Sequence, residues 1–135
     1  MVPAPFNKSG GDISRIIGHN ESRNRDYYGN GNAVVSPKGA RFRMQVMPAT
    51  ARDPGYGITP ARDNSPAEFN RVGEEYWRAM LKEFNGNFPQ MFAAYNAGPG
   101  RVQQAIKRGG ADWLRYLPAE TRNYVQNNMR MLRGS

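Results

Sequence analysis

The sequence predicts a mainly α-helical domain that also holds one small β-hairpin or irregular loop. In several segments the apolar residues recur at intervals of three and four, which is the spacing of an amphipathic helix. Glycine- and proline-rich stretches separate these segments. We expect one domain over residues 1–135, because a chain of this length buries a core without disulfides. Residues 1–11 are expected to be a disordered arm, and residues 133–135 an appended remnant that carries no weight in the fold prediction.

The first expected helix covers residues 12–21. Ile13, Ile16 and Ile17 repeat at helical spacing, which predicts one apolar face. Glu21 follows Ile17 by four residues and therefore ends the same face.

Two small elements follow this helix. An Asn30-Gly31 pair stands between aromatic and β-branched residues, so residues 27–35 predict a hairpin or an ordered loop. A short helical piece is expected over residues 44–47, and Pro48 is placed to begin the next turn.

The longest helix is expected to begin at Ser65 and to stop near Gly86. Ser65 is the capping residue, Pro66 takes the first helical position, and Glu68 completes a capping box. A stripe at helical spacing then predicts a central core helix; its members are Phe69, Val72, Tyr76, Met80 and Phe84.

Three further helical pieces complete the predicted domain. A Gly-Pro-Gly break at residues 98–100 ends the first, and two glycines at residues 109–110 end the second. A short turn then leads to Pro118, which opens the last helix. The residues expected on their inner faces are Phe88, Met91, Phe92 and Tyr95, then Val102, Ala105 and Ile106, then Val125, Met129 and Leu132.

Composition excludes several classes of function. The chain has no cysteine, so it has neither a disulfide framework nor a thiolate metal site. His19 is the one histidine, which argues against a histidine metal centre or a Ser-His triad. No stretch approaches the roughly 20 apolar residues of a membrane span. Residues 1–11 lack a basic start and an apolar core, so we expect no signal peptide.

The formal net charge of +8, from 19 Lys and Arg against 11 Asp and Glu, implies an anionic partner or surface. The arginines are scattered along the chain, without a dense basic tail, zinc-finger spacing or an RNA-binding aromatic signature. We therefore expect a solvated basic surface and no specific nucleic-acid partner.

Glu21 is the candidate catalytic residue. A carboxyl group on an apolar face loses solvation, and this raises its pKa because the charged form is disfavoured. A carboxylic acid that keeps its proton near neutral pH can donate it to a glycosidic oxygen. The competing interpretation is a helix-end salt bridge with Arg23 or Arg25, which the spacing alone favours.

Most glycosidases need two carboxyl groups that face each other across the scissile bond. Between Glu21 and Gly39 the only other acid is Asp26, just beyond the first helix. Asp26 is therefore the candidate second carboxylate, unless the fold supplies another.

Four islands of unusual sequence follow one another along the chain. They are Glu21-Ser22; Ser36, Gly39 and Ala40 running on to Met44, Gln45, Met47 and Pro48; Tyr95-Asn96-Ala97-Gly98; and Glu120-Thr121-Arg122 with Tyr124-Val125. In this order they resemble the motifs of the lytic transglycosylase catalytic domain, a family that cuts peptidoglycan. The resemblance implies an α+β, lysozyme-like fold with the hairpin or loop beside the active-site cleft. It also implies that one glutamate acts as acid and then base, while the acetamido group and C6 hydroxyl of the substrate replace the second carboxylate and the water.

The resemblance assigns catalysis to Glu21 and implies no metal and no cofactor. The residues that it places in substrate binding are Ser36, Gln45, Met47, Tyr95, Asn96 and Glu120. Several residues of these motifs also have an ordinary structural interpretation. Methionines at 44 and 47 fill cores, Asn96 and Gly98 suit a helix cap, and Glu120 suits an exposed first turn.

The chain departs from the family pattern in two places. Phe42 and Arg43 stand where the family has glycine and leucine, so we expect Phe42 to obstruct or reshape the cleft and to strain the backbone. The span from Glu21 to Ser36 is also longer than is common in the family. Within this span, Tyr27, Tyr28 and Asn30 are expected either to make extra contacts to glycan or to form a packed loop.

The leading functional hypothesis is a lytic transglycosylase that cleaves the MurNAc-β-1,4-GlcNAc bond to leave 1,6-anhydro-MurNAc ends. The alternatives are a muramidase that uses Asp26, and a glycan-binding or structural module with activity lowered by Phe42. The expected partners are peptidoglycan glycan strands and the anionic bacterial envelope, and the expected state is a monomer. We expect action at the bacterial cell wall or periplasm, after delivery as a phage lysis (endolysin) or virion protein, or as a domain of a bacterial wall enzyme.

Overall fold

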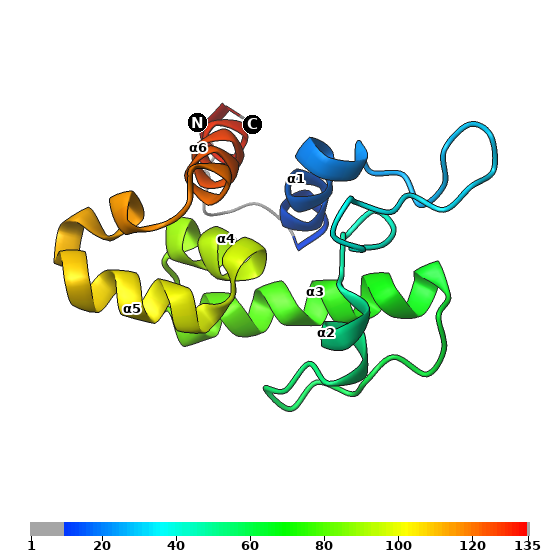
Figure 1. Cartoon of the computed structure of the whole chain (residues 1–135), viewed down its shortest axis with the longest axis horizontal. Coiled ribbons are helices and arrows are strands. Elements are labelled where there is room, and N and C mark those ends of the chain that lie inside the picture. Colours follow the sequence, from blue (N-terminus) through cyan, green and yellow to red (C-terminus); the bar gives the residue numbers. More distant parts are fainter. Residues whose placement is uncertain (1–9, 135) are drawn as a thin grey trace, which may run out of the picture. The chain divides into compact units, whose positions relative to one another are not determined.

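The computed structural model describes residues 10–134, without the side chains of Asn20 and Glu21. The expected arm over residues 1–11 lies largely outside the described residues. The fold is mainly helical, as predicted (Figure 1). Its elements are α1 (Gly10–Ser22), α2 (Pro48–Arg52), α3 (Pro66–Glu83), α4 (Phe88–Ala97), α5 (Pro99–Gly109), the 3₁₀ helix η2 (Gly110–Tyr116) and α6 (Ala119–Gly134).

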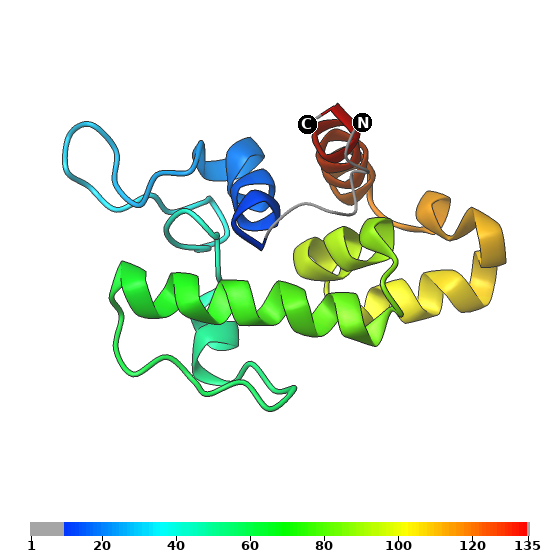
Figure 2. The same cartoon turned by 180° about the vertical axis from the view of Figure 1, so that it is seen from behind.

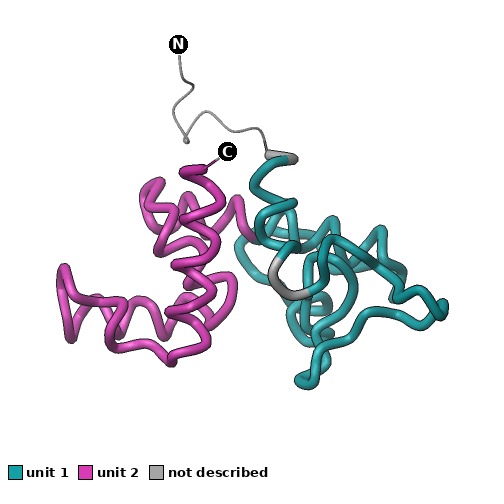
Figure 3. The backbone as a smooth tube through the Cα atoms, turned by 90° about the horizontal axis from the view of Figure 1, so that it is seen from above, with its two compact units in different colours: residues 1–76 teal, residues 77–135 magenta. Residues whose placement is uncertain are grey.

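The chain divides into two compact units, residues 1–76 and residues 77–135 (Figure 3). The boundary falls inside α3. The first unit holds α1, α2 and the irregular segments around them, and the second holds α4 to α6. No described helix is long and apolar enough to cross a membrane.

In the first unit, α1 buries the predicted isoleucine face: Ile13, Ile16 and Ile17 are all buried. The segment from 27 to 35 is a loop closed by an isolated antiparallel bridge between Tyr27 and Ala33. At its tip the N–H of Gly31 donates to the Tyr28 carbonyl at 2.9 Å. The sequence therefore placed this turn correctly, and Figure 1 shows it without a strand arrow.

The helical piece expected over residues 44–47 was wrong. Residues 42–45 form a turn, and isolated bridges join Arg41 to both Val35 and Val46. Gln45 has a φ of 52°, which ends any right-handed helical run. Pro48 begins α2, as predicted.

A long loop joins α2 to α3 (Figure 2). At the start of α3 the Ser65 hydroxyl accepts from the N–H of Glu68 at 3.2 Å, so the predicted cap forms. The reciprocal half of the capping box does not, because Glu68 Oε1 accepts from the N–H of Arg62 at 2.9 Å instead. Helix α3 ends at Glu83, before the left-handed residues Asn85 and Gly86.

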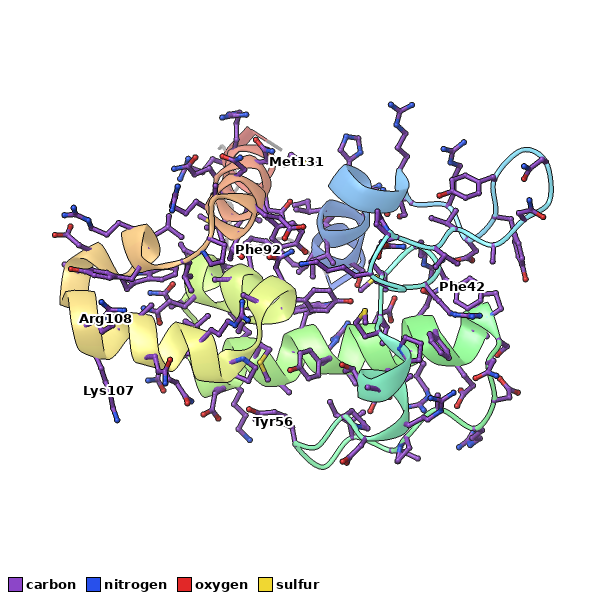
Figure 4. All side chains as sticks on the ribbon, viewed as in Figure 1. Phe42, Tyr56, Phe92, Lys107, Arg108 and Met131 are labelled. Atoms are coloured by element: carbon purple, nitrogen blue, oxygen red, sulfur yellow. The ribbon has the colours of Figure 1, made fainter. Side chains whose placement is uncertain are left out.

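In the second unit, α4 packs against α5 and α6, and η2 packs on α5. Gly98, with a φ of 95°, makes the predicted break between α4 and α5. The buried apolar residues of the unit include Phe92, which Figure 4 labels on α4, and Val102, Val125 and Leu132. Arg133 and Gly134 continue α6.

Candidate active site

Glu21 is the penultimate residue of α1, but its side chain lies outside the described residues. The candidate site is therefore built from the groups that hold the end of α1. Beyond Ser22 the chain leaves the helix through two left-handed residues, Arg23 and Asn24, with φ values of 53° and 60°. This sharp reversal directs the chain into the loop that begins at Asp26.

Ser22 joins the end of α1 to the turn at residues 42–45. Its side chain is buried, and its hydroxyl lies 2.8 Å from the carbonyl oxygens of both Gly18 and Arg43. The hydroxyl shares its single proton between these acceptors and itself accepts from the N–H of Asn24 at 3.1 Å. Ser22 is therefore a structural link beside Glu21.

Gly18 lets the turn approach α1 closely. A Cβ atom on Gly18 would lie 2.8 Å from the carbonyl oxygen of Arg43 and 2.5 Å from Asn24 Oδ1. Real Cβ atoms are essentially never this close to such atoms. Because glycine has no Cβ, Gly18 leaves room for the Arg43 carbonyl to accept the hydrogen bond from Ser22.

The side chain of Phe42 is buried in the first unit. It is 3% exposed, and its ring makes edge contacts with Phe69 at 5.6 Å and Tyr27 at 6.1 Å between ring centroids. Figure 4 labels Phe42 on the loop next to the N-terminal part of α3. The expected backbone strain is present, because its φ of 64° is left-handed. Such a conformation costs roughly 1–3 kcal/mol for a residue of this type.

The predicted substrate-binding residues of the first unit differ in their exposure. Gln45 is buried, and its Nε2 donates to the Phe42 carbonyl at 2.8 Å. Ser36 uses its hydroxyl to accept from the N–H of Ala40 at 3.0 Å, which closes the turn at residues 36–40. Met47 is exposed. Of the three, Met47 has the side chain most available to a ligand.

Asp26 is part of a hydrogen-bond network that reaches α3. One of its oxygens, Oδ1, accepts both from the N–H of Arg43 at 3.0 Å and from Nδ2 of Asn70 at 2.8 Å. Asn70 is buried, and its Oδ1 accepts from the N–H of Met44 at 3.2 Å. Asp26, the candidate second carboxylate, therefore links the turn at residues 42–45 to α3 within the first unit.

The second unit brings two of the predicted motifs together. Asn96, near the end of α4, accepts from the hydroxyl of Thr121 in the first turn of α6, with 2.8 Å between Oδ1 and Oγ1. Tyr95 is half-buried next to Asn96, and Glu120 is exposed next to Thr121. The tyrosine-asparagine and glutamate-threonine motifs are therefore neighbours through the Asn96–Thr121 bond.

Comparison with known proteins identifies the family. The model of the transglycosylase SLT domain matches residues 20–113. The chain belongs to the transglycosylase SLT domain family. The chain is 36% identical to the soluble lytic murein transglycosylase of Escherichia coli K12 over 107 residues. That match covers 70% of the chain. The membrane-bound lytic murein transglycosylase D of the same organism is 35% identical over 92 positions, or 60% of the chain.

Two solved structures are similar to the whole domain. The lytic transglycosylase Slt of Pseudomonas aeruginosa, solved as an inactive Glu-to-Gln mutant, gives a TM-score of 0.70 at 32% identity over 90% of this chain. The 70-kDa soluble lytic transglycosylase of E. coli gives 0.70 at 28% identity over 93% of this chain. Both relatives are longer: the chain spans 16% of the first curated relative and 20% of the Pseudomonas structure.

Two residues of the site were not found from the sequence. Asn70 lies between Phe69 and Val72 on the buried face of α3, and a polar side chain at such a position is a signal of an internal hydrogen-bond network. Thr121 stands inside a recognised motif, but its bond to Asn96 depends on how α4 and α6 pack. The spacing of residues along the sequence does not indicate that Asn96 and Thr121 are hydrogen-bond partners.

Proposed function

We propose that this domain is a lytic transglycosylase that cleaves the MurNAc-β-1,4-GlcNAc linkage of peptidoglycan without water, with Glu21 as acid and then base. The observation that carries the proposal is the position of Glu21, next to the braced Ser22 at the end of α1, in a chain that belongs to the SLT family. The Pseudomonas relative was solved as an inactive Glu-to-Gln mutant, which supports a chemistry that needs a glutamate.

In the proposed reaction the protonated carboxyl of Glu21 donates its proton to the glycosidic oxygen, and the bond from that oxygen to C1 of MurNAc breaks. The substrate's acetamido group stabilises the cationic character that develops at C1. Glu21 then takes the proton from the C6 hydroxyl of the same MurNAc while the C6 oxygen bonds to C1. The carboxyl group is restored and no water is consumed, so the product carries a 1,6-anhydro ring.

The muramidase alternative needs a second carboxylate, and Asp26 was its candidate. Asp26 Oδ1 already accepts two hydrogen bonds, from the Arg43 N–H and from Asn70. These contacts support the single-glutamate chemistry over the hydrolytic one. The buried position of Phe42 likewise removes the reason for expecting a module with a blocked cleft.

We further propose that glycan binding involves Ser36, Gln45 and Met47 of the first unit, and Tyr95, Asn96 and Glu120 of the second. Met47 and Glu120 are exposed and suit direct contact, whereas Gln45 is buried and suits a supporting role. The domain would act at the bacterial cell wall, in keeping with its family and its net charge of +8. Delivery by a phage and a monomeric state remain predictions.

The test is a digest of purified peptidoglycan by the wild-type protein, Glu21→Gln and the matched control Glu83→Gln, with products identified by mass spectrometry. Glu83 lies at the end of α3, belongs to none of the predicted motifs, and accepts a hydrogen bond from Gln103. We expect muropeptides one water lighter than hydrolysis products from the wild type and the control, and none from Glu21→Gln. Reducing-end products would support a muramidase, and full activity of Glu21→Gln would reject the assignment.

A further inference from the structure

We propose that Asp26 and Asn70 are positioning residues: together they fix the turn at residues 42–45 against the end of α1 that carries Glu21. The proposal rests on the proposed role of Glu21. It assigns Asp26 a task other than that of a second catalytic carboxylate. The supporting observations are a connected set of hydrogen bonds within the first unit, two left-handed residues that need external support, and one close backbone approach.

The pair holds two consecutive backbone amides of the turn. Asp26 Oδ1 accepts from the N–H of Arg43, and Asn70 Oδ1 accepts from the N–H of Met44. Asn70 Nδ2 then donates to the same Asp26 oxygen at 2.8 Å, which orients both side chains. Because Asn70 is 3% exposed on α3, a rigid helix anchors the whole arrangement.

The turn needs this support because of its backbone conformation. Phe42 and Gln45 enclose the two held amides, and both have left-handed φ values, 64° and 52°. Neither residue is a glycine, so each is held in a conformation that a free chain would leave. The bonds to Arg43 and Met44 are in the right place to prevent that relaxation.

The same turn is joined to the end of α1 on its other side. The Arg43 carbonyl accepts from the Ser22 hydroxyl at 2.8 Å, and the close approach at Gly18 fits this carbonyl against the helix. Arg43 is therefore bonded through its N–H to Asp26 and through its carbonyl to Ser22, the residue next to Glu21. A path of hydrogen bonds runs from α3 through Asn70, Asp26 and Arg43 to Ser22.

The geometry provides a sharp way to separate a positioning role from a catalytic one. Both bonds to Asp26 end on a single oxygen, so the amide oxygen of Asp26→Asn can accept both of them. Asp26→Asn therefore keeps the proposed function of the residue and removes its carboxylate. Asp26→Ala removes the one oxygen that accepts both bonds, and Asn70→Ala leaves the Met44 N–H without its side-chain acceptor.

The experiment measures kcat/KM for release of anhydro-muropeptides, and its pH profile, in the wild type, Asp26→Asn, Asp26→Ala and Asn70→Ala. Asp53→Asn, at the end of α2, controls for loss of a carboxylate elsewhere. We expect Asp26→Ala and Asn70→Ala to lose about tenfold or more, because small misplacements at an active site are costly. Asp26→Asn should stay within about threefold of wild type, with an unchanged pH profile, because the hydrogen bonds persist. Loss of activity in Asp26→Asn comparable to Glu21→Gln would overturn the proposal, and so would full activity in Asp26→Ala.

Amide hydrogen exchange of the same variants tests the positioning itself, without reference to catalysis. We expect the N–H groups of Arg43 and Met44 to exchange faster in Asp26→Ala and at the wild-type rate in Asp26→Asn. The N–H of Asp53, bonded to Ala49 in α2, is the internal control.

If the wild type released no anhydro product, the proposed function would fail while this measurement still decided whether the pair holds the turn. Unchanged exchange at both amides in Asp26→Ala would reject the positioning role. Should Asp26→Ala fail to fold, the activity and exchange of Asp26→Asn remain decisive.

Discussion

At the scale of single residues, the turn at Phe42 shows how one side chain can outweigh an unfavourable backbone. Its φ of 64° suits glycine, which needs no Cβ at such a position. The phenylalanine ring is nevertheless buried between Phe69 and Tyr27, and burial of an aromatic ring stabilises the fold by more than the strain costs. The residue is therefore a core residue in a glycine-like backbone conformation.

Replacement of Phe42 tests this balance. Truncation of a buried phenylalanine costs roughly 3–5 kcal/mol, whereas relief of left-handed strain returns about 1–2 kcal/mol. We expect Phe42→Gly to destabilise the protein by about 1–4 kcal/mol in urea unfolding. Phe42→Ala is the matched control and should be less stable still, because it loses the ring and keeps the strain. Neither variant should gain cleavage activity; a large gain in Phe42→Gly would restore the obstruction hypothesis.

Residue patterns predicted some features of the site and missed others for physical reasons. The Ser65 cap and the Gly98 break depend on neighbours in sequence, and both were predicted correctly. The prediction of a helical piece at residues 44–47 was wrong. Gln45 is left-handed there, and the amides of Arg43 and Met44 just before it bond to side chains that are distant in the sequence. The Asn70–Asp26 bond joins residues 44 positions apart, which no local spacing indicates.

At the scale of elements, the packing of α1 against the turn depends on Gly18. Alanine normally stabilises a helix relative to glycine by roughly 1 kcal/mol. At position 18 the Cβ of alanine would lie 2.8 Å from the Arg43 carbonyl oxygen, so alanine should destabilise the protein here instead of stabilising it. We expect Gly18→Ala to lower stability by about 1–3 kcal/mol, as in other overpacked sites. Gly29→Ala is the control, since nothing lies within 4 Å of its added Cβ. Equal thermal stability of the two variants would contradict this account.

The start of α3 is held by a charged network that should respond to acid. Glu68 bonds to Arg71 and to the Arg62 N–H, and these bonds lower its pKa from 4.5 to about 2. Arg71 also donates to the carbonyl oxygens of Thr59 and Pro60, which ties the α2–α3 loop to the helix.

Because the folded pKa of Glu68 is depressed, its contribution to stability is complete above pH 4.5 and is lost as the pH falls towards 2. We therefore expect the difference in unfolding free energy between wild type and Glu68→Gln to shrink across this window. Glu83→Gln controls for loss of a carboxylate elsewhere on α3. A difference that stayed constant from pH 5 to 2 would show that the network has no such role.

At the scale of the whole molecule, the positive charge is unevenly distributed along the chain. Residues 1–76 hold ten Lys and Arg against eight Asp and Glu, whereas residues 77–135 hold nine against three. Arg108 and Arg115 of the second unit lie 5.1 and 5.9 Å from the ring of Tyr116, and Figure 4 labels Arg108 beside the exposed Lys107. Attraction to an anionic surface should therefore come mainly from the second unit.

Binding to isolated cell walls, measured by sedimentation over a range of salt, tests this expectation. We expect binding to weaken as salt screens the charges. The double variant Arg108→Gln/Arg115→Gln should weaken it more than Arg52→Gln/Arg62→Gln, which removes the same charge from exposed positions of the first unit. Equal losses would show that the asymmetry is irrelevant to wall binding.

Product analysis in water labelled with heavy oxygen tests whether the proposed reaction of Glu21 breaks the glycan without water. Peptidoglycan is digested by the wild-type protein in the labelled water, and the new ends are analysed by mass spectrometry. We predict anhydro ends that carry no label, because the C6 oxygen of the sugar closes the ring. Reducing ends that carry the label would contradict the proposed reaction and show that water is the nucleophile.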